Sequence, residues 1–222
     1  DGFCVGEPWN QRAVMGNVGK ALITGYQLWQ DGPEKVLGVQ KSFALKYPET
    51  TKQMMEAVIE AGVWLDASWE NRKEASKILS SKSYVNAPTD VIDNSMTGTY
   101  MFTNGVVTKM PYFNRFAKGA ALYPYYSHGL WNVTQMIRWG QLDHAVDMKK
   151  VVESVYRPDL FAAAAKEVKY ALPASPWKKE SKFMDGVTFD PNKSVDYIFN
   201  APIKSPKITK AALAKVNKWT VK

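Results

Sequence analysis

Hydrophobic residues recur at helical spacing in the first half of the chain. Apolar side chains three and four positions apart follow Pro48, a residue that suits the first position of a helix. They predict one helical face made by Met54, Met55, Val58, Ile59, Gly62 and Leu65. Ser68 can cap a second helix through Leu79, and the stretch 10–20 predicts a shorter one. Consecutive amphipathic helices beside short strands are typical of an α/β layer.

The same spacing returns in the second half, after a less regular stretch at 83–126. That stretch is rich in Pro, Gly, Asn and Tyr, so we expect extended loop with one short helix after Thr89. Ser127 is expected to cap a helix, Asp143 another, and Pro158 to open a third. The three apolar faces would carry Leu130, Trp131, Thr134 and Ile137; Val151, Val152 and Val155; and Leu160, Phe161, Ala164 and Val168.

Short apolar runs bounded by turn residues predict strands. The first run, Phe3 to Val5, should end at the turn containing Pro8, and the ranges 21–24 and 36–39 predict two more. Asp185-Gly186 predicts a tight turn between short strands. Because the first run has the character of a buried strand interior, we expect further sequence upstream of it.

Composition places the chain among ordinary globular proteins. Of its 222 residues, 45% are hydrophobic and 23% are charged, which permits a sizeable core. The formal charge of +8 favours anionic partners. Six lysines and no acid lie from Ile203 onward, where we expect a solvated and partly frayed end. No nucleic-acid recognition motif accompanies them, so nucleic acid is not an expected partner.

Residue patterns that signal catalysis or metal binding are missing. The chain has no Gly-x-Ser-x-Gly elbow and no phosphate-binding Gly-x-x-x-x-Gly-Lys loop. Cys4 could pair with His128 or His144, but a small buried thiol is the interpretation we favour. Two histidines and one cysteine, without ligand spacing, do not suggest zinc. We therefore expect no cofactor and a protein that is not an enzyme.

The informative stretches are those that could recognise a ligand. They are Asp1-Gly-Phe-Cys-Val-Gly-Glu-Pro-Trp-Asn10, Pro33-Glu-Lys-Val-Leu37, Tyr84-x-x-x-Pro88, Tyr123-Pro-x-x-Ser-His128, Arg138-Trp139-Gly140 and Phe183-x-Asp-Gly-Val-x-Phe-Asp190. In this order, over roughly residues 1–200, they resemble the nitrate- and bicarbonate-binding proteins of bacterial ABC importers. The resemblance concerns the C-terminal portion of those proteins.

The resemblance implies an α/β fold of the type II periplasmic-binding class, a two-lobed clamp whose N-terminal lobe is largely missing here. Residues 1–35 would end lobe 2, and 36–82 would provide the hinge strand and the return helices of lobe 1. Residues 83–202 would form the long, mostly helical C-terminal extension of the family. The basic tail 203–222 lies outside the resemblance.

The resemblance also implies candidate ligands for a small anion. In the family the anion lies between the lobes, and a lysine from the downstream half contributes to binding; a charge-assisted hydrogen bond from such an ammonium would stabilise a buried anion. Lys35 is our first choice and Lys118 the second. Glu7, Trp9 and Asn10 could line the site or brace the hinge, and both alternatives stay open. The family usually carries His where this chain has Gly32.

The function implied is capture of a small oxyanion, nitrate or nitrite, for an ABC importer. Its partners would be the permease and ATPase subunits, and its location the periplasm or the outer face of the inner membrane. Two alternatives stay open. One is a bicarbonate-binding protein, in which an acidic residue and Ca²⁺ replace the lysine. The other is a cytosolic nitrate sensor that regulates a partner protein.

Overall fold

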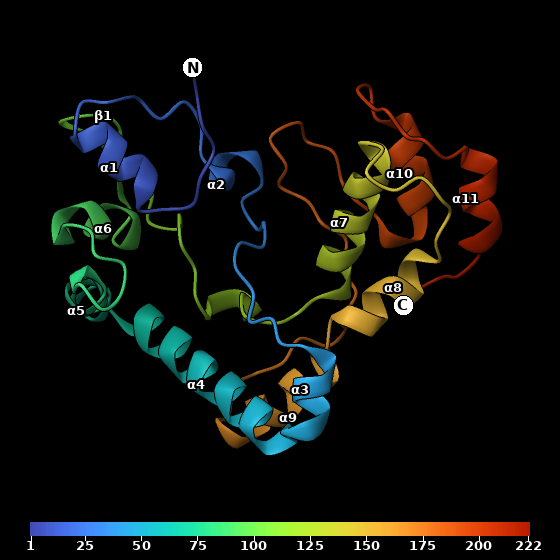
Figure 1. Ribbon diagram of the computed structural model, residues 1–222, viewed down its shortest axis with the longest axis horizontal. Helices are drawn as coiled ribbons and strands as arrows, with labels where there is room; N and C mark the ends of the chain where they lie inside the picture. Colours follow the sequence, from blue (N-terminus) through green and yellow to red (C-terminus); the bar gives the residue numbers. More distant parts are fainter. The chain divides into compact units, whose positions relative to one another are not determined.

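The computed structural model describes all of residues 1–222, and helices dominate it (Figure 1). The first elements are α1 (Trp9–Met15), α2 (Gly25–Leu28), α3 (Lys41–Lys46), α4 (Pro48–Ala67), α5 (Trp69–Ser80), α6 (Thr89–Met96), β1 (Thr99–Thr103) and β2 (Val106–Lys109). The 3-10 helix η1 (Lys118–Ala120), α7 (Tyr126–Arg138), α8 (Met148–Val155), α9 (Pro158–Glu167), η2 (Pro191–Lys193), α10 (Ser194–Asn200) and α11 (Lys210–Val216) follow.

The chain divides into two units, and each consists of two separate stretches. The first unit contains Asp1–Gln30 and Ala57–Leu122, and the second contains Asp31–Glu56 and Tyr123–Lys222. Helix α4 therefore begins in the second unit and ends in the first. The lobe boundaries expected at residues 35, 82 and 202 refer to a complete protein and stay a prediction.

The first unit is built around α5, α6 and a two-stranded hairpin. Strands β1 and β2 pair antiparallel around Asn104-Gly105, and Gly105 has a φ of 78°. An Asn-Gly pair between β-rich runs is a strong hairpin signal, because its residues adopt the positive φ angles of a tight turn. The composition of 83–126 predicts loop with one short helix; α6 confirms the helix, but the hairpin differs from this prediction.

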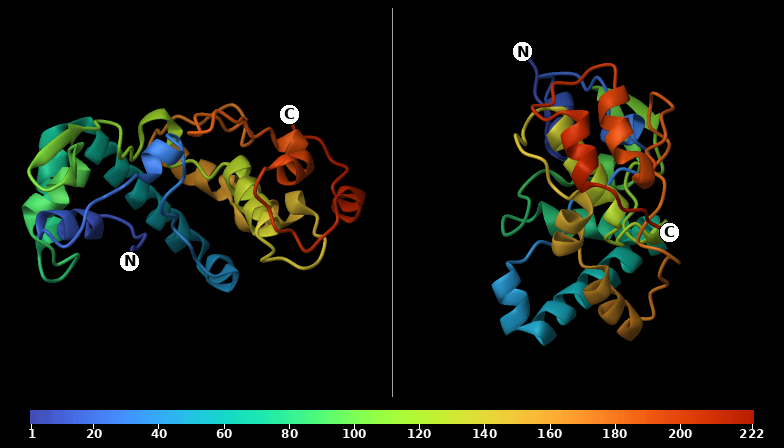
Figure 2. Two further views of the ribbon diagram at one scale, coloured as in Figure 1. Left: turned by 90° about the horizontal axis from the view of Figure 1, so that it is seen from above. Right: turned by 90° about the vertical axis from the view of Figure 1, so that its right-hand side faces the viewer.

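The core of the second unit lies between α7, α8, α10 and α11. Figure 2 shows the C-terminal helices in red beside α7 and α8 in yellow. The buried side chains are Leu130, Val133, Ile137, Met148, Val152, Phe189, Ile198, Ile208 and Leu213. The lysine-rich sequence predicted a frayed end after Ile203, and this prediction was wrong. Helix α11 inserts Leu213 into this core, and Trp219 stacks against Trp177.

Helix starts were predicted better than strands. Helices begin at Pro48 and Pro158, and the Ser68 hydroxyl caps α5 by accepting the Asn71 amide. Two predicted caps were wrong. Ser127 lies inside α7 and bonds to a distant carboxylate, and Asp147 rather than Asp143 caps α8.

The three strands predicted at 1–9, 21–24 and 36–39 are absent from the structure. These runs are extended or irregular, and their apolar side chains are largely exposed. A strand requires a neighbour that completes its hydrogen bonds. Of these runs, only the Ala21 amide bonds to a strand, donating to the Phe102 carbonyl of β1 at 3.0 Å, and no run joins a sheet. Cys4, which we expected to be buried, is exposed for the same reason.

Candidate functional site

Glu7 ties the start of α1 to the hairpin. Its carboxylate accepts hydrogen bonds from the Tyr100 hydroxyl at 2.9 Å and from the Gln11 amide at 3.2 Å. Burial, together with the neighbouring Glu7 carboxylate, raises the pKa of Tyr100, so this phenol stays protonated and donates. Both oxygens of Glu7 are thus engaged within the first unit.

Trp9 and Asn10 follow Glu7 in the same turn but differ in their availability. Asn10 donates from Nδ2 to the Val5 carbonyl at 2.7 Å, which holds the preceding segment against α1. The Trp9 side chain has an exposed fraction of 43%, with the Arg12 guanidinium 5.9 Å from its ring centroid. Of these three candidates, Trp9 presents the side chain most available to a ligand.

Gln11 is a functional neighbour that the sequence analysis missed. Its side chain is fully buried and bonds twice to Met101, donating to the carbonyl at 2.8 Å and accepting from the amide at 3.1 Å. The pair of bonds reproduces the pattern of a strand partner. Gln11 therefore fixes α1, and with it the Glu7–Asn10 turn, against β1.

Lys35 lies in the second unit, within an extended stretch after Asp31. Its side chain is 77% exposed, and its ammonium pairs with the adjacent Glu34 at 3.3 Å. An exposed ion pair of this kind contributes little stability. Binding an anion would therefore cost the Lys35 side chain only a weak, exposed ion pair.

Lys118 lies in the first unit, and its main chain rather than its side chain is fixed. The amides of Phe116, Ala117 and Lys118 all donate to one oxygen of the buried Asp66, at 3.0, 2.7 and 2.8 Å. The Lys118 side chain is exposed. Asp66 thus sets the position of the loop from which the second candidate lysine projects.

Asp66 is held ionised by its surroundings. Burial opposes its ionisation, but the Lys118 and Ala117 amides and the Arg72 guanidinium outweigh burial and lower the pKa of this carboxyl. Arg72 is itself buried and also donates to the carbonyls of Met96 and Asn114, at 2.9 and 3.0 Å. Neither Asp66 nor Arg72 stood out in the sequence, because most of their other partners lie 24 to 52 residues away.

A second buried carboxylate organises the motif at Ser127-His128. Glu180 accepts from the Ser127 hydroxyl at 2.6 Å and from the Lys178 ammonium at 2.8 Å, and His128 Nε2 lies 3.5 Å away. Burial opposes its charge, while His128, Lys178 and Ser127 together lower the pKa of Glu180. The fully buried Ser127 hydroxyl donates to the carboxylate. This cluster joins α7 to the segment after Trp177.

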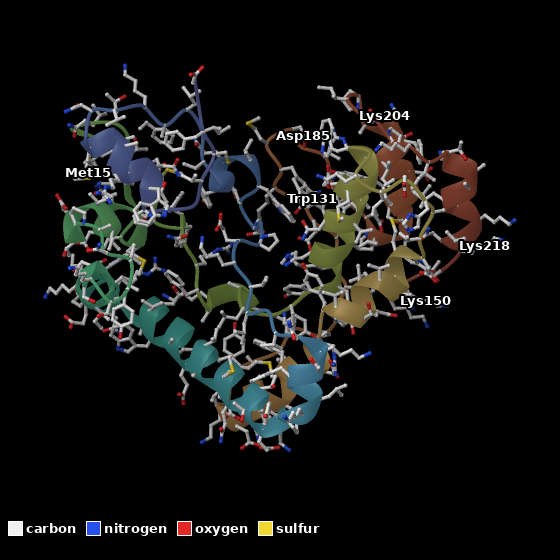
Figure 3. All side chains as sticks on the ribbon, in the orientation of Figure 1. Met15, Trp131, Lys150, Asp185, Lys204 and Lys218 are labelled. Atoms are coloured by element: carbon white, nitrogen blue, oxygen red, sulfur yellow. The ribbon has the colours of Figure 1, made fainter.

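The remaining motif residues of the second unit also make contacts within it. Trp131, labelled on α7 in Figure 3, stacks on Phe183 with ring centroids 6.0 Å apart. Arg138 donates to the Ile203 carbonyl at 2.8 Å and lies over Trp139. These motifs therefore specify how the second unit folds.

A hollow in the second unit contains none of the candidate residues. It is polar, and the Lys210–Asp196 ion pair, at 2.6 Å, lies in its wall. Its lining residues are Asn192, Lys193, Ser194, Val195, Asp196, Lys210, Ala214, Asn217 and Trp219. No three His, Cys, Asp or Glu residues gather where they could share a metal ion. No helix is both long and apolar enough to cross a bilayer.

Comparison with known proteins identifies the relatives of this chain. Residues 1–80 match the model of the NMT1-like family. A nitrate/nitrite-binding protein of Synechocystis PCC 6803 is 38% identical over 213 residues, covering 93% of this chain and 47% of the relative. The crystal structure of the periplasmic nitrate-binding protein of the same organism superposes with a TM-score of 0.85 at 36% identity, covering 91% of this chain and 53% of that one.

Over more than 90% of its length, the chain is similar to the nitrate- and bicarbonate-binding proteins of ABC importers. The resemblance drawn from the motifs is thereby confirmed, and so is the fold class, part of a type II binding-protein fold. A bicarbonate-binding protein of Synechococcus elongatus is a more distant member, 29% identical over 222 residues, covering 92% of this chain and 48% of that protein. The chain spans about half the length of these relatives.

Similarity to these proteins leaves the roles of the candidate residues as a proposal. The structure brings Glu7, Trp9 and Asn10 together in one turn of the first unit, which also contains Lys118. Lys35 belongs to the second unit. The hydrogen bonds of Glu7 and Asn10 support the alternative in which these two brace the fold, while the exposed Trp9 and Lys35 are better suited to meet a ligand.

Proposed function

We propose that this chain is part of a substrate-binding protein that captures nitrate or nitrite for an ABC importer. The proposal rests on the greater sequence identity of the chain to nitrate/nitrite-binding proteins than to bicarbonate-binding proteins. Three nitrate/nitrite-binding proteins are 36% to 38% identical to it, whereas the bicarbonate-binding ones are 29% identical. The proteins of both kinds match over more than 90% of the chain, so the difference does not reflect unequal coverage.

The relatives also support the proposed partners and location. One is a nitrate import ATP-binding protein of Synechocystis, 36% identical over 199 residues, which joins a region like this one to an ATP-binding protein. The protein would deliver its anion to a permease driven by such an ATPase, in the periplasm or at the outer face of the inner membrane. The relatives are binding proteins and transport components, and the proposed action is binding without chemical change.

Titration calorimetry of the complete protein tests the substrate. We expect heat on addition of nitrate and of nitrite, and no heat with bicarbonate in the presence of Ca²⁺. A nitrate monoanion needs a cationic or donor-rich site, because burying its charge without partners is costly. Calcium-dependent heat with bicarbonate, and none with nitrate, would assign the protein to the bicarbonate branch instead.

We propose that Lys35 supplies the positive charge that binds the anion. Replacing Lys35 by Ala in the complete protein should weaken nitrate affinity at least tenfold, about 1.4 kcal/mol of binding free energy. Stability should not change, because the side chain is exposed and its single ion pair is with Glu34.

Lys41→Ala is the matched control for this prediction. Lys41 is also an exposed lysine of the second unit, and it opens α3 six residues further on. Its removal should leave the dissociation constant unchanged. If Lys35→Ala binds nitrate normally while Lys118→Ala does not, the role passes to Lys118.

A further inference from the structure

The polar hollow of the second unit lies between the start of α10 and α11, outside the motifs that predicted anion capture. These two helices are in contact and appear as neighbours in Figure 1. The volume of the hollow is 170 Å³, below the roughly 300 Å³ at which sites for drug-sized ligands begin. A space of this size admits one small molecule.

Hydrogen bonds from side chains to main chain fix the wall of the hollow. Asn217 accepts from the Met148 amide at 2.9 Å and donates to the Val146 carbonyl at 2.9 Å. Asn192 exchanges two bonds with Val221, donating to its carbonyl at 3.1 Å and accepting from its amide at 2.7 Å. Because this wall is already ordered, binding would not lose free energy to ordering it.

The lining of the hollow carries a net positive charge. It contains two lysines, Lys193 and Lys210, and one acid, Asp196. Lys210 and Asp196 neutralise each other in their ion pair at 2.6 Å. Lys193 is exposed and forms no ion pair, because Asp190, the acid whose charge it senses, pairs with Lys179 at 3.0 Å. One ammonium is therefore available to a ligand with a single negative charge.

Ser194, the next residue, adds a hydroxyl that has no partner in the protein. Ser194 lines the hollow and is only 3% exposed, and its hydroxyl makes no hydrogen bond within the structure. Buried polar groups are nearly always paired, so an unpaired hydroxyl in the wall of a hollow indicates a ligand atom as its partner. A hydroxyl can donate to an anionic oxygen, as the Lys193 ammonium can.

The rest of the lining is apolar and restricts the ligand further. Val195, Ala214 and Trp219 contribute apolar surface. The Trp219 ring is held in place, since it stacks on Trp177 with centroids 6.4 Å apart and its Nε1 donates to Asn217 at 3.2 Å. Apolar surface of this kind favours a ligand that buries hydrocarbon, which neither nitrate nor inorganic phosphate contains.

We propose that this hollow is a binding site for a small monocarboxylate with a short hydrocarbon chain. Lys193 and the Ser194 hydroxyl donate to its carboxylate oxygens, and Trp219 covers its chain. A charge-assisted hydrogen bond from the ammonium supplies much of the attraction, and the chain adds apolar burial. The site is additional to the proposed anion capture and does not depend on which anion is transported.

Butyrate, titrated into the complete protein after saturation with nitrate, tests this site. The indole N–H resonance of Trp219, assigned by its loss in Trp219→Phe, should shift with a dissociation constant of about 1 mM or tighter. Acetate should bind about fivefold more weakly, because it has two fewer CH₂ groups to bury. The first addition, of nitrate alone, should leave this resonance unchanged.

Ser194→Ala separates a binding role from a structural one. It should weaken butyrate binding about threefold or more, yet the Tm should not fall, because the hydroxyl has no partner in the protein to lose. Lys193→Gln should weaken binding about tenfold, because it removes the free ammonium. Lys215→Gln is the matched control, since Lys215 is an exposed lysine of α11 outside the hollow. Its affinity for butyrate should equal that of wild type.

Four results would overturn the proposal. The first is no saturable shift of Trp219 with butyrate. The second is a shift with nitrate or inorganic phosphate as strong as with butyrate, which would indicate a general anion site. The third is equal weakening by Lys193→Gln and Lys215→Gln, which would indicate attraction by overall charge. The fourth is a lower Tm for Ser194→Ala with unchanged affinity. Nitrate binding is measured separately in the first addition, so failure of the carboxylate site leaves the test of anion capture intact.

Discussion

Replacing Asp66 by Asn is expected to lower the free energy of unfolding by about 3 kcal/mol or more. The carboxylate accepts three main-chain amides and pairs with the buried Arg72. Asparagine keeps the shape of the side chain but loses its charge. Its NH₂ group, a donor, would also face either the main-chain amides or the Arg72 guanidinium, which are donors themselves. A buried guanidinium without a counter-charge is costly, and Arg72 is 6% exposed.

The effect of Asp66→Asn should depend on pH in one direction. The pKa of Asp66 is lowered in the folded protein, so its carboxylate contributes stability at neutral pH. That contribution is present above the ordinary carboxyl value of 3.8 and is lost as the pH falls through the lower, folded value. The difference between wild type and variant should therefore shrink only in acid.

Urea denaturation followed by circular dichroism measures this difference, with the midpoint shifting at constant slope. Glu70→Gln is the control, because Glu70 is an exposed acid in the first turn of the neighbouring α5. Its effect should stay within about 0.5 kcal/mol. A variant Asp66→Asn as stable as wild type would show that the Asp66 network does not hold the loop that carries Lys118.

Glu180→Gln should cost about 2 kcal/mol. The side chain is 1% exposed and bonds to Ser127 and Lys178, with His128 beside it. The cost is smaller than for Asp66 because Lys178 is partly exposed, so water can solvate its ammonium once the carboxylate is gone. The loss should appear as unfolding of the second unit at lower urea concentration.

The pH dependence of the Glu180 contribution has the same sign. The pKa of Glu180 is lowered, so its stabilisation holds above the ordinary value of 4.5 and disappears as the pH falls through the folded value. Glu153→Gln provides the comparison, since Glu153 forms a more open ion pair with Lys149 at 3.6 Å on α8. If both variants lose equally little stability, Glu180 does not anchor α7.

Helix positions were largely readable from the sequence because their signals are local. Proline at the first position marked α4 and α9, and the Ser68 hydroxyl marked α5. The Asn104-Gly105 turn is an equally local signal for the hairpin, although the loop-like composition around it predicted no strands. Asp147 was overlooked as a cap because Asp143 stands only four residues before it.

Strands and buried charges were not readable in the same way, because both depend on distant partners. The apolar run 36–39 suits a strand but has no neighbour here, and the lysine-rich end concealed Leu213, which α11 buries in the core. Asp66 meets amides 50 to 52 residues away and Glu180 meets Ser127 53 residues away. Only the fold reveals such pairs.

The candidate site came from family resemblance more than from residue pattern. Glu7 and Asn10 were predicted either to line the site or to brace the hinge, and their hydrogen bonds within the first unit support bracing. Trp9 and Lys35 keep exposed side chains, which is what a ligand-contacting role requires. Pattern alone could not separate these roles, because all four are polar or aromatic residues near turns.

A crystal structure of the complete protein with nitrate bound tests the central claim most directly. The account predicts an enclosed anion with the Lys35 ammonium at hydrogen-bond distance, about 2.7–3.2 Å from a nitrate oxygen. An anion site walled only by apolar groups, or no enclosed anion with Lys35 still in solvent, would contradict it.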